Sequence, residues 1–297
     1  MLDCRRATLI YNPAARKLQR GCGEKLRKIK DALTSFGVQA EFLPTERSLH
    51  AAELSRKAVE SGTELIIVCG GDGTVNEVIA GMAGSAVPLL VLPAGTANVL
   101  AKDLRLDKGL TAPLRLLQEG AVRRIALGMA NGRPFALMAG IGVDAGVVAA
   151  VHPALKKKAG QGAFWLAGFR QLFQYSFPEL ELTSGGNTYR ATFAVIARSH
   201  SYGGPLSLVP QADLFADRFD VCLFEGRSRW VYLRYLVFAL FRRHLHLSGV
   251  RHFAASSVDV QGDPGLWIQV DGELLGHVPA RFTILPDALS LVVPADR

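Results

Sequence analysis

The sequence lacks any uninterrupted apolar run of the length that a membrane-spanning helix needs, about 20 residues. Its two most apolar stretches, 89–101 and 230–241, are broken by proline and glycine or by arginine. The first residues of the chain contain no apolar core of a signal peptide. We therefore expect a soluble, cytoplasmic protein, with at most a peripheral position at the inner surface of the membrane.

Cysteine is scarce, and the four cysteines (Cys4, Cys22, Cys69 and Cys222) form no CxxC pair. That spacing predicts neither a zinc site nor a disulfide framework. Acidic residues are outnumbered, with 26 Asp and Glu against 34 Lys and Arg, which gives a formal net charge of +8. The excess favours an anionic partner, such as nucleotide phosphates or an anionic membrane surface. No basic recognition element for nucleic acid is present, so we expect no nucleic-acid partner.

The 297 residues suffice for two domains. Over residues 1–124, short apolar runs alternate with segments of helical periodicity. The expected strands are 7–11, 38–43, 65–69 and 88–92, and the expected helices are 23–36, 49–61 and 74–83. This repeated β-α-β pattern predicts an α/β domain with a parallel sheet that helices cover on both faces.

From residue 125 onward, short strands joined by turns replace this pattern. Asn131-Gly132 and Gly185-Gly186-Asn187 are hairpin signals, because these residues tolerate a positive φ. The expected strands are 125–129, 135–139, 179–182, 188–197, 219–224, 258–261, 267–270 and 281–285, and the expected helices are roughly 164–175 and 229–245. We predict an antiparallel β domain over residues 125–297 with inserted helices, whose last strand can return to the first domain.

The densest chemical signal is Gly70–Glu77, which reads Gly-Gly-Asp-Gly-Thr-Val-Asn-Glu between a buried strand and an apolar helix. Glycines let the backbone approach a ligand, and the N–H groups of a helix N-terminus face anions. The segment is neither a Walker A loop nor a GxGxxG motif. We expect a phosphate-binding loop, and the competing interpretation is a tight turn capped by Thr74. A second loop, Pro93–Asn98, follows the next strand at the same edge of the sheet, where ligands bind in open α/β sheets.

These motifs resemble those of the diacylglycerol kinase catalytic domain family of lipid kinases, which includes bacterial soluble lipid kinases, sphingosine kinases and ceramide kinases. The resemblance continues through Asn12-Pro13, residues 140–144, residues 202–204 and Asp271-Gly272-Glu273, and covers nearly the whole chain. The first motif is shared with NAD kinases and phosphofructokinases, whereas its Val-Asn-Glu extension and the late Asp-Gly-Glu favour the lipid branch. The resemblance implies a nucleotide-binding α/β domain of the NAD kinase/diacylglycerol kinase type over residues 1–124. It also implies a lipid-substrate β-sandwich over residues 125–297.

The resemblance further implies which residues do the chemistry. ATP would be bound by Asn12, Thr45, Gly70, Gly71, Asp72, Gly73, Thr74, Val75, Asn76, Glu77, Gly95, Thr96 and Asn98. Asp72 would also help to hold the catalytic Mg²⁺, directly or through water. Glu273 would take the proton from the lipid hydroxyl, with Asp271 as a supporting carboxylate. Taken without the resemblance, Asp271-Gly272 is a common hairpin turn.

A structural Mg²⁺ site is implied as well, because bacterial lipid kinases of this type hold such an ion with one aspartate and nearby backbone carbonyls. Oxygen ligands of this kind suit Mg²⁺. Here they would be the Asp217 side chain and the carbonyls of Leu214 and Phe219. The usual Asp-Gly is replaced by Asp217-Arg218, which places a positive charge beside the site. An ordinary surface turn is the alternative.

Two segments, 156–177 and 228–247, mix aromatic and basic residues, which suits a membrane surface that carries anionic lipid. A pair of core helices with solvated basic faces is the competing interpretation. We predict an ATP- and Mg²⁺-dependent lipid kinase that phosphorylates diacylglycerol or a related lipid alcohol during transient peripheral contact with a membrane. The alternatives are a kinase of a soluble acceptor such as NAD, or a lipid-binding protein without turnover. The oligomeric state is left open.

Overall fold

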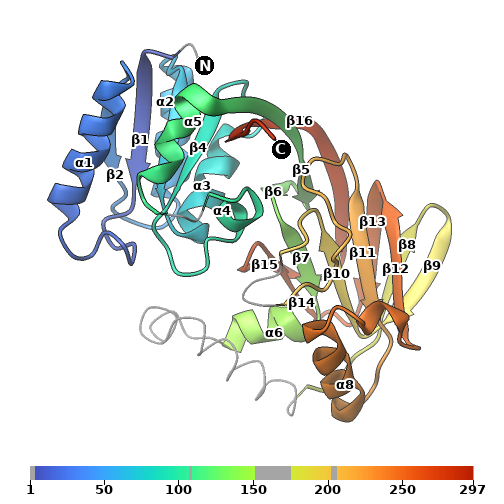
Figure 1. Ribbon diagram of the computed structural model, residues 1–297. Coiled ribbons are helices and arrows are strands. Elements are labelled where there is room, and N and C mark those ends of the chain that lie inside the picture. Colours follow the sequence, from blue (N-terminus) through green and yellow to red (C-terminus); the bar gives the residue numbers. More distant parts are fainter. Residues whose placement is uncertain (1–3, 107–108, 151–174, 202–205, 297) are drawn as a thin grey trace. The chain divides into compact units, whose positions relative to one another are not determined.

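The computed structural model describes residues 4–106, 109–150, 175–201 and 206–296, which fold into two units (Figure 1). Unit 1 contains residues 1–127 and 286–297, and unit 2 contains residues 128–285. Unit 1 is an α/β fold with a parallel sheet and unit 2 consists of antiparallel β-sheets, which confirms the predicted fold class. The last strand, β16 (Ala280–Pro294), begins in unit 2 and ends in unit 1.

The parallel sheet of unit 1 has the strand order β2-β1-β3-β4, and the final part of β16 adds to β4 in parallel. Its strands are β1 (Arg6–Tyr11), β2 (Gln39–Pro44), β3 (Leu65–Gly70) and β4 (Pro88–Pro93), followed by β5 (Gly120–Ala130), which pairs with β16. Its helices are α1 (Cys22–Ser35), α2 (His50–Glu60), α3 (Asp72–Met82), α4 (Val99–Asp103), η1 (Ala112–Arg115) and α5 (Leu116–Glu119). Every residue of β3 is buried, because β3 lies between β1 and β4 and is covered by α3. The continuous apolar run that predicted a central strand is explained by this burial, since both faces of β3 are covered.

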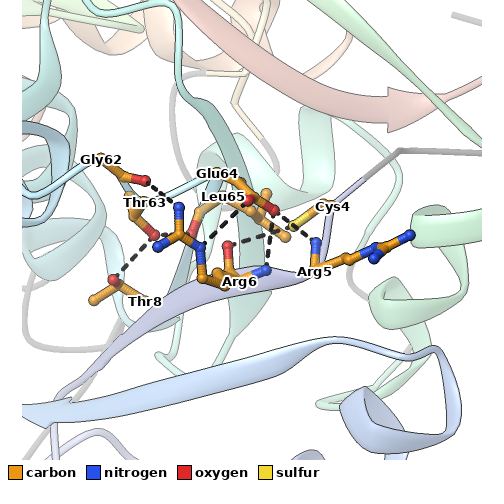
Figure 2. A network of polar contacts seen from close by, with 8 residues as sticks. All are labelled: Cys4, Arg5, Arg6, Thr8, Gly62, Thr63, Glu64 and Leu65. Carbon is orange, nitrogen blue, oxygen red and sulfur yellow. Dashed lines mark hydrogen bonds and ion pairs between the residues drawn. The ribbon is translucent and has the colours of Figure 1, made fainter.

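The amino ends of β1 and β3 are joined by a polar network around Glu64 (Figure 2). The Glu64 carboxylate accepts hydrogen bonds from the backbone N–H groups of Arg5 (2.7 Å) and Arg6 (3.1 Å) and pairs with the Arg6 guanidinium. These N–H groups stabilise the charged carboxylate and lower the pKa of Glu64. The Thr8 and Thr63 hydroxyls bond to each other at 3.1 Å. The network fixes the register of the two strands at the end opposite to the glycine-rich loops.

Unit 2 is a β-sandwich. One sheet has the order β12-β11-β10-β7-β14-β15, and the other contains β16, β13, β8 and β9 in that order, with β5 and β6 beside β16. The strands are β6 (Arg133–Phe135), β7 (Met138–Ile141), β8 (Leu180–Ser184), β9 (Asn187–Ala191), β10 (Phe193–Ala197), β11 (Phe219–Phe224), β12 (Val250–Ala255), β13 (Ser257–Gly262), β14 (Trp267–Val270) and β15 (Glu273–His277). Apolar side chains of both sheets, among them Phe135, Phe219 and Phe282, form one buried cluster between the sheets.

Two segments that were predicted as single strands are divided between the two sheets. Residues 135–139 are split between β6 and β7, and residues 188–197 between β9 and β10. Both predictions were wrong. Residues 135–139 are apolar throughout, and an apolar run does not show where the chain changes sheets. In 188–197, mostly exposed residues of β9 are followed by the fully buried β10, and the change from one pattern to the other marks the crossing. At the second crossing, the Thr192 hydroxyl donates to the Phe224 carbonyl at 3.1 Å. Strands β12 and β15 and helix α6 (Val143–Ala150) were not predicted. Nearly all of the predicted helix 164–175, and the motif at 202–204, lie outside the described residues.

Helix α8 (Arg229–Leu240) covers the outer face of the six-stranded sheet in unit 2. It begins after Ser228, whose hydroxyl accepts a hydrogen bond from the Val231 N–H at 3.4 Å. It ends at Leu240 and is followed by η2 (His244–His246), so the predicted helix 229–245 is shorter than expected. Among the described residues, no helix is both long enough and apolar enough to cross a membrane.

Candidate active site

The parallel strands of unit 1 end at one edge of the sheet. Tyr11 pairs with Pro44 and Cys69, and Gly70 pairs with Pro93. The predicted nucleotide-binding residues follow these strand ends directly: Asn12, Thr45, the segment 70–77, Gly95, Thr96 and Asn98. Since ligands of open α/β sheets bind outside the carboxyl ends of the strands, this edge is where a nucleotide is expected.

The two glycine-rich loops touch backbone to backbone. A Cβ atom placed on Gly95 would lie 2.5 Å from the Cα of Gly71, a distance that real Cβ contacts essentially never reach. A Cβ atom on Gly70 would lie 2.5 Å from the Cβ of Thr74. The Ala94 N–H also donates to the Gly70 carbonyl at 2.8 Å. Glycine at position 95 therefore lets the two neighbouring loops meet, and glycine at position 70 leaves room for the Thr74 side chain at the start of α3.

Asp72 ties the second loop to the first. One of its carboxylate oxygens accepts a hydrogen bond from the Asn98 N–H at 2.9 Å, and the other accepts from the Val99 N–H at 2.6 Å. These N–H groups open helix α4, so Asp72 acts as the cap that the helix lacks from its own N-cap residue. Asn98 in turn binds both the N–H and the carbonyl of Gly95 through its side-chain amide. Asp72 thus holds the position of Gly95 through Asn98.

Helix α3 starts inside the first loop and presents its N-terminal amides there. The Val75 N–H bonds to the Gly71 carbonyl at 3.0 Å, and the amides of Asp72, Gly73 and Thr74 belong to the first turn, where a helix supplies no acceptor of its own. Asn12 reaches the same turn, because its side-chain amide donates to the Thr74 hydroxyl at 3.3 Å. The backbone amides of Asp72, Gly73 and Thr74 and the side chain of Asn12 therefore lie at one helix N-terminus, an arrangement that suits the binding of phosphate oxygens.

Some of the residues that were predicted to bind ATP have side chains that pack in the core or cap a helix. The Val75 side chain is 5% exposed and belongs to the core, so only its backbone faces the loop. The Glu77 carboxylate accepts a hydrogen bond from the Ala51 N–H at 3.1 Å and so caps helix α2. Asn76 is half-buried on α3, Thr45 is half-buried after β2, and Thr96 is exposed in the second loop.

In unit 2, the acidic turn 271–273 is a two-residue hairpin between β14 and β15. Asp271 and Gly272 both have positive φ, at 48° and 82°, as a type I′ turn requires. The Asp271 carboxylate accepts hydrogen bonds from three successive N–H groups, those of Ala136 (2.7 Å), Leu137 (2.9 Å) and Met138 (2.9 Å). These are the residues at which the chain crosses from β6 to β7. Asp271 therefore positions the turn and stabilises the crossing between the two sheets.

Burial raises the pKa of Asp271 from its ordinary 3.8 to about 6, despite the three N–H groups that favour the charged form. A raised pKa in the folded state means that the protonated carboxyl stabilises the fold. This contribution is complete below pH 3.8 and is lost as the pH rises through about 6.

We expect this pH dependence to disappear in Asp271→Asn. Relative to that variant, the free energy of unfolding of the wild type should fall by about 2–3 kcal/mol between pH 4 and pH 7. Urea denaturation of both proteins at several pH values in this range measures the difference. A difference that is constant with pH would show that Asp271 does not titrate as its burial implies.

Glu273, the predicted base, forms an ion pair with Arg133 at the start of β6. Arg133 also donates to the Leu274 carbonyl at 3.3 Å, so its guanidinium holds both the side chain and the backbone of this strand. Gln269, which is 4% exposed, accepts a hydrogen bond from the Gly272 N–H at 2.7 Å and donates to Asp144 at 3.1 Å. Sequence reasoning missed the roles of Arg133 and Gln269, because their partners are set by strand pairing rather than by any local motif.

The described residues fit the two implied Mg²⁺ ions differently. They contain no group of three or more His, Cys, Asp or Glu side chains that could hold a metal ion. A catalytic Mg²⁺ needs only one or two carboxylates beside substrate phosphates and water, and each Asp72 oxygen keeps acceptor capacity besides its N–H bond, so Asp72 fits that role. The implied structural ion does not fit, because the positive charge of the buried Arg198 guanidinium already lies at the Leu214 carbonyl, to which it donates at 2.7 Å, and would repel a divalent cation there.

The other two implied ligands of that site are the Phe219 carbonyl and the Asp217 side chain. Phe219, whose backbone carbonyl is the implied ligand, begins β11 and pairs with Ala255. Arg218 forms an ion pair with Asp220 at 3.6 Å, and Asp217 is exposed.

Comparison with known proteins decides the family. Residues 6–130 match the diacylglycerol kinase catalytic domain, and residues 138–293 match the YegS C-terminal NAD kinase beta sandwich-like domain. The chain belongs to the diacylglycerol kinase family. It is 27% identical over 300 residues to the diacylglycerol kinase of Bacillus subtilis (strain 168), covering 99% of this chain and 98% of the relative. It is 27% identical over 298 residues to that of Staphylococcus epidermidis (strain ATCC 12228 / FDA PCI 1200), covering 98% of this chain and 93% of the relative.

A solved structure of a diacylglycerol kinase from Bacillus anthracis has the same fold, with a TM-score of 0.77, 21% identity, and coverage of 99% of this chain and 98% of that one. Membership of the diacylglycerol kinase family makes the chain a kinase that phosphorylates a lipid alcohol and uses ATP. The boundary between the two matched domains, between residues 130 and 138, coincides with the hairpin and sheet crossing of β5, β6 and β7.

Proposed function

We propose that this chain transfers the γ-phosphate of ATP to the hydroxyl of diacylglycerol or a closely related lipid alcohol. The observation that carries the proposal is the pair of glycine loops at the carboxyl edge of unit 1, which meet at Gly71 and Gly95 and are tied together by Asp72. The choice of acceptor is supported by relatives named diacylglycerol kinase that match along nearly the entire chain.

In this proposal, the first-turn amides of α3 bind phosphate oxygens, and Asn12, Thr45 and Thr96 contribute further contacts to ATP. Asp72 holds the second loop in place and contacts Mg²⁺ directly or through water. When bound, the metal would neutralise charge on the phosphates. Asp72 thereby acts on both loop geometry and metal binding.

Glu273 takes the proton of the lipid hydroxyl as the bond to phosphorus forms. Arg133 engages one carboxylate oxygen, Oε2, so the proton would go to Oε1. Asp271, with its oxygens on three backbone N–H groups, keeps the turn in position and is a positioning residue in this scheme. The reaction leaves ADP and a lipid phosphate. We place the enzyme in the cytoplasm, in transient contact with the inner surface of the membrane.

A second candidate is a kinase of NAD, because unit 2 matches a domain described as NAD kinase beta sandwich-like. Incubating the purified protein with γ-labelled ATP and a panel of acceptors separates the candidates. We expect label in lipid phosphate with diacylglycerol in mixed micelles, none in NADP, and no transfer in the presence of a chelator. Label in NADP alone would establish the second candidate, and ATP binding without transfer to any acceptor would indicate a binding protein.

A further inference from the structure

Helix α8 buries one side and exposes a second apolar side. Tyr232, Tyr235 and Ala239 are buried against the outer face of the six-stranded sheet, together with Phe193 and Phe224. Of the eight large hydrophobic side chains that are exposed among the described residues, five lie on this helix or its C-cap: Trp230, Val237, Phe238, Leu240 and Phe241. Trp230 is 65% exposed and Phe241 is 72% exposed. The helix is therefore apolar around most of its circumference, although the sheet covers only one side.

The same segment carries charge of one sign only. Residues 226–258 contain six arginines and no aspartate or glutamate. Two of these arginines, Arg227 and Arg251, form ion pairs with Glu179 and Glu225, which lie outside the segment. The other four, which are Arg229, Arg234, Arg242 and Arg243, are exposed beside the apolar side chains. Arg229 stacks over the ring of Trp230, with 5.9 Å from its Cζ to the ring centroid.

We propose that this outer surface of α8, with Trp230, Phe238, Phe241 and the arginines beside them, docks on an anionic lipid bilayer. Aromatic and apolar side chains enter the interface between headgroups and acyl chains, while arginines pair with lipid phosphates. The helix has 12 residues and is about 18 Å long, too short to cross a hydrocarbon core of about 30 Å, so it lies on the surface.

The charge of the segment favours a bilayer over a second copy of the chain. In a symmetric dimer through this surface, arginines would face arginines with no acidic side chain of the segment to neutralise them. An anionic bilayer supplies both the negative charge and the apolar layer. In Figure 1, α8 (orange-brown) lies at the outside of unit 2, beyond the strands that it covers.

Sedimentation with lipid vesicles tests this proposal in the absence of ATP and diacylglycerol, so its outcome is independent of kinase activity. We expect the wild type to bind phosphatidylglycerol-containing vesicles, to bind pure phosphatidylcholine vesicles at least about tenfold more weakly, and to lose affinity as the salt concentration rises. Trp230→Ser with Phe241→Ser, and separately Arg242→Glu with Arg243→Glu, should each weaken binding at least about tenfold.

Matched controls change exposed residues of unit 1. Val122→Ser removes another exposed apolar side chain, and Arg27→Glu with Lys30→Glu reverses two exposed charges on α1. These variants should bind as the wild type does. Equal binding by the α8 variants, or no binding by the wild type, would overturn the proposal. So would a wild-type dimer in sedimentation equilibrium that the α8 variants dissociate, since the surface would then belong to a second copy.

A second inference rests on Arg198, which is 1% exposed and points into the loop that was predicted to hold a structural Mg²⁺. Its two terminal nitrogens donate to the carbonyls of Leu214 (2.7 Å) and Ala216 (3.0 Å). Burial lowers the pKa of Arg198 to about 10, and the negative charges of Asp217 and Asp213 oppose that shift. The guanidinium therefore stays charged near neutral pH, inside a loop whose carbonyl oxygens point at it.

We infer that Arg198 takes the place of a structural divalent cation in the loop 213–219. Either a guanidinium or a metal ion can place a positive charge against these carbonyl oxygens, the first by donating hydrogen bonds and the second by coordination. Because the arginine is part of the chain, the loop should keep its structure when no metal is available.

Thermal unfolding with and without a chelator, in the absence of nucleotide and lipid, tests the inference. The Tm of the wild type should be the same in EDTA and in millimolar Mg²⁺, to within about 1 °C. Arg198→Met should lower the Tm by about 5–10 °C, since two buried carbonyls lose a charged donor. Asp31→Asn, the matched control at an exposed aspartate of α1, should change the Tm by less than about 2 °C. A wild-type Tm that falls in EDTA and recovers with Mg²⁺ would overturn the inference, even if Arg198→Met does not fold.

Discussion

Replacing Asp72 with alanine is expected to lower kcat/KM by at least about 10³-fold while the protein remains folded. Both carboxylate oxygens accept backbone hydrogen bonds that open α4, and the variant leaves those two N–H groups without their acceptor. Hydrogen bonds to a charged acceptor contribute roughly 1.5–3 kcal/mol each, so the carboxyl end of the loop 94–98 loses its anchor on α3. A displacement of about 1 Å in a group that positions the substrate costs roughly 10²-fold in rate, and loss of the metal contact adds to that.

The control for this variant is Asp31→Ala on the exposed side of α1, which should leave kcat/KM unchanged. Steady-state kinetics and the Tm should be measured on both proteins. Near-normal turnover by Asp72→Ala would remove Asp72 from the mechanism. A Tm that falls by tens of degrees would show that the loops contribute to global stability rather than to local geometry alone.

The second large effect is expected at Glu273. If this carboxylate takes the proton from the lipid hydroxyl, Glu273→Gln should lower kcat by 10²–10⁴-fold, the usual contribution of a positioned base, estimated to order of magnitude. Glutamine keeps the length and polarity of the side chain but cannot hold the proton. The affinity for ATP should hardly change, because the nucleotide loops belong to unit 1 and Glu273 belongs to unit 2.

Two further variants separate chemistry from structure at this position. Glu179→Gln removes another ion-paired glutamate of unit 2 and should leave kcat near the wild-type value. Arg133→Gln removes the partner that orients Glu273, and we expect kcat to fall by only about tenfold, since the base itself remains. The ion pair between Arg133 and Glu273 is about one-third exposed, so its loss should shift the Tm very little. Wild-type turnover by Glu273→Gln would transfer the role of base to water or to Asp271.

The parallel sheet of unit 1 could be predicted because each of its elements carries a local signal. The buried run 65–69 and the periodic segment 23–36 differ from the structure by no more than one residue at either end. The glycine loop was recognisable for a related reason, since a strand end, two glycines and a helix start are adjacent in the sequence. What the sequence did not show is why Gly95 must be glycine, because the atom that a side chain would meet belongs to Gly71.

Unit 2 was harder to predict, because its decisive contacts join residues that are far apart in the chain. The crossing at residues 136–138 is held by Asp271, more than 130 residues later. Arg198 is a similar case. Its acceptors are backbone carbonyls, which every residue has, so they cannot be recognised from the residue types in the sequence. The one sequence signal that could have suggested an internal cation is Arg198 itself, which directly follows the apolar run 194–197.

Mass spectrometry of the reaction product tests the central claim most directly. Purified protein, ATP, Mg²⁺ and diacylglycerol in mixed micelles should yield one phosphatidic acid for each ADP formed, and Asp72→Ala under the same conditions should yield neither above background. Formation of ADP with no gain of phosphate by the lipid, or no reaction with diacylglycerol while NAD is converted to NADP, would contradict the assignment of this chain as a kinase of a lipid alcohol.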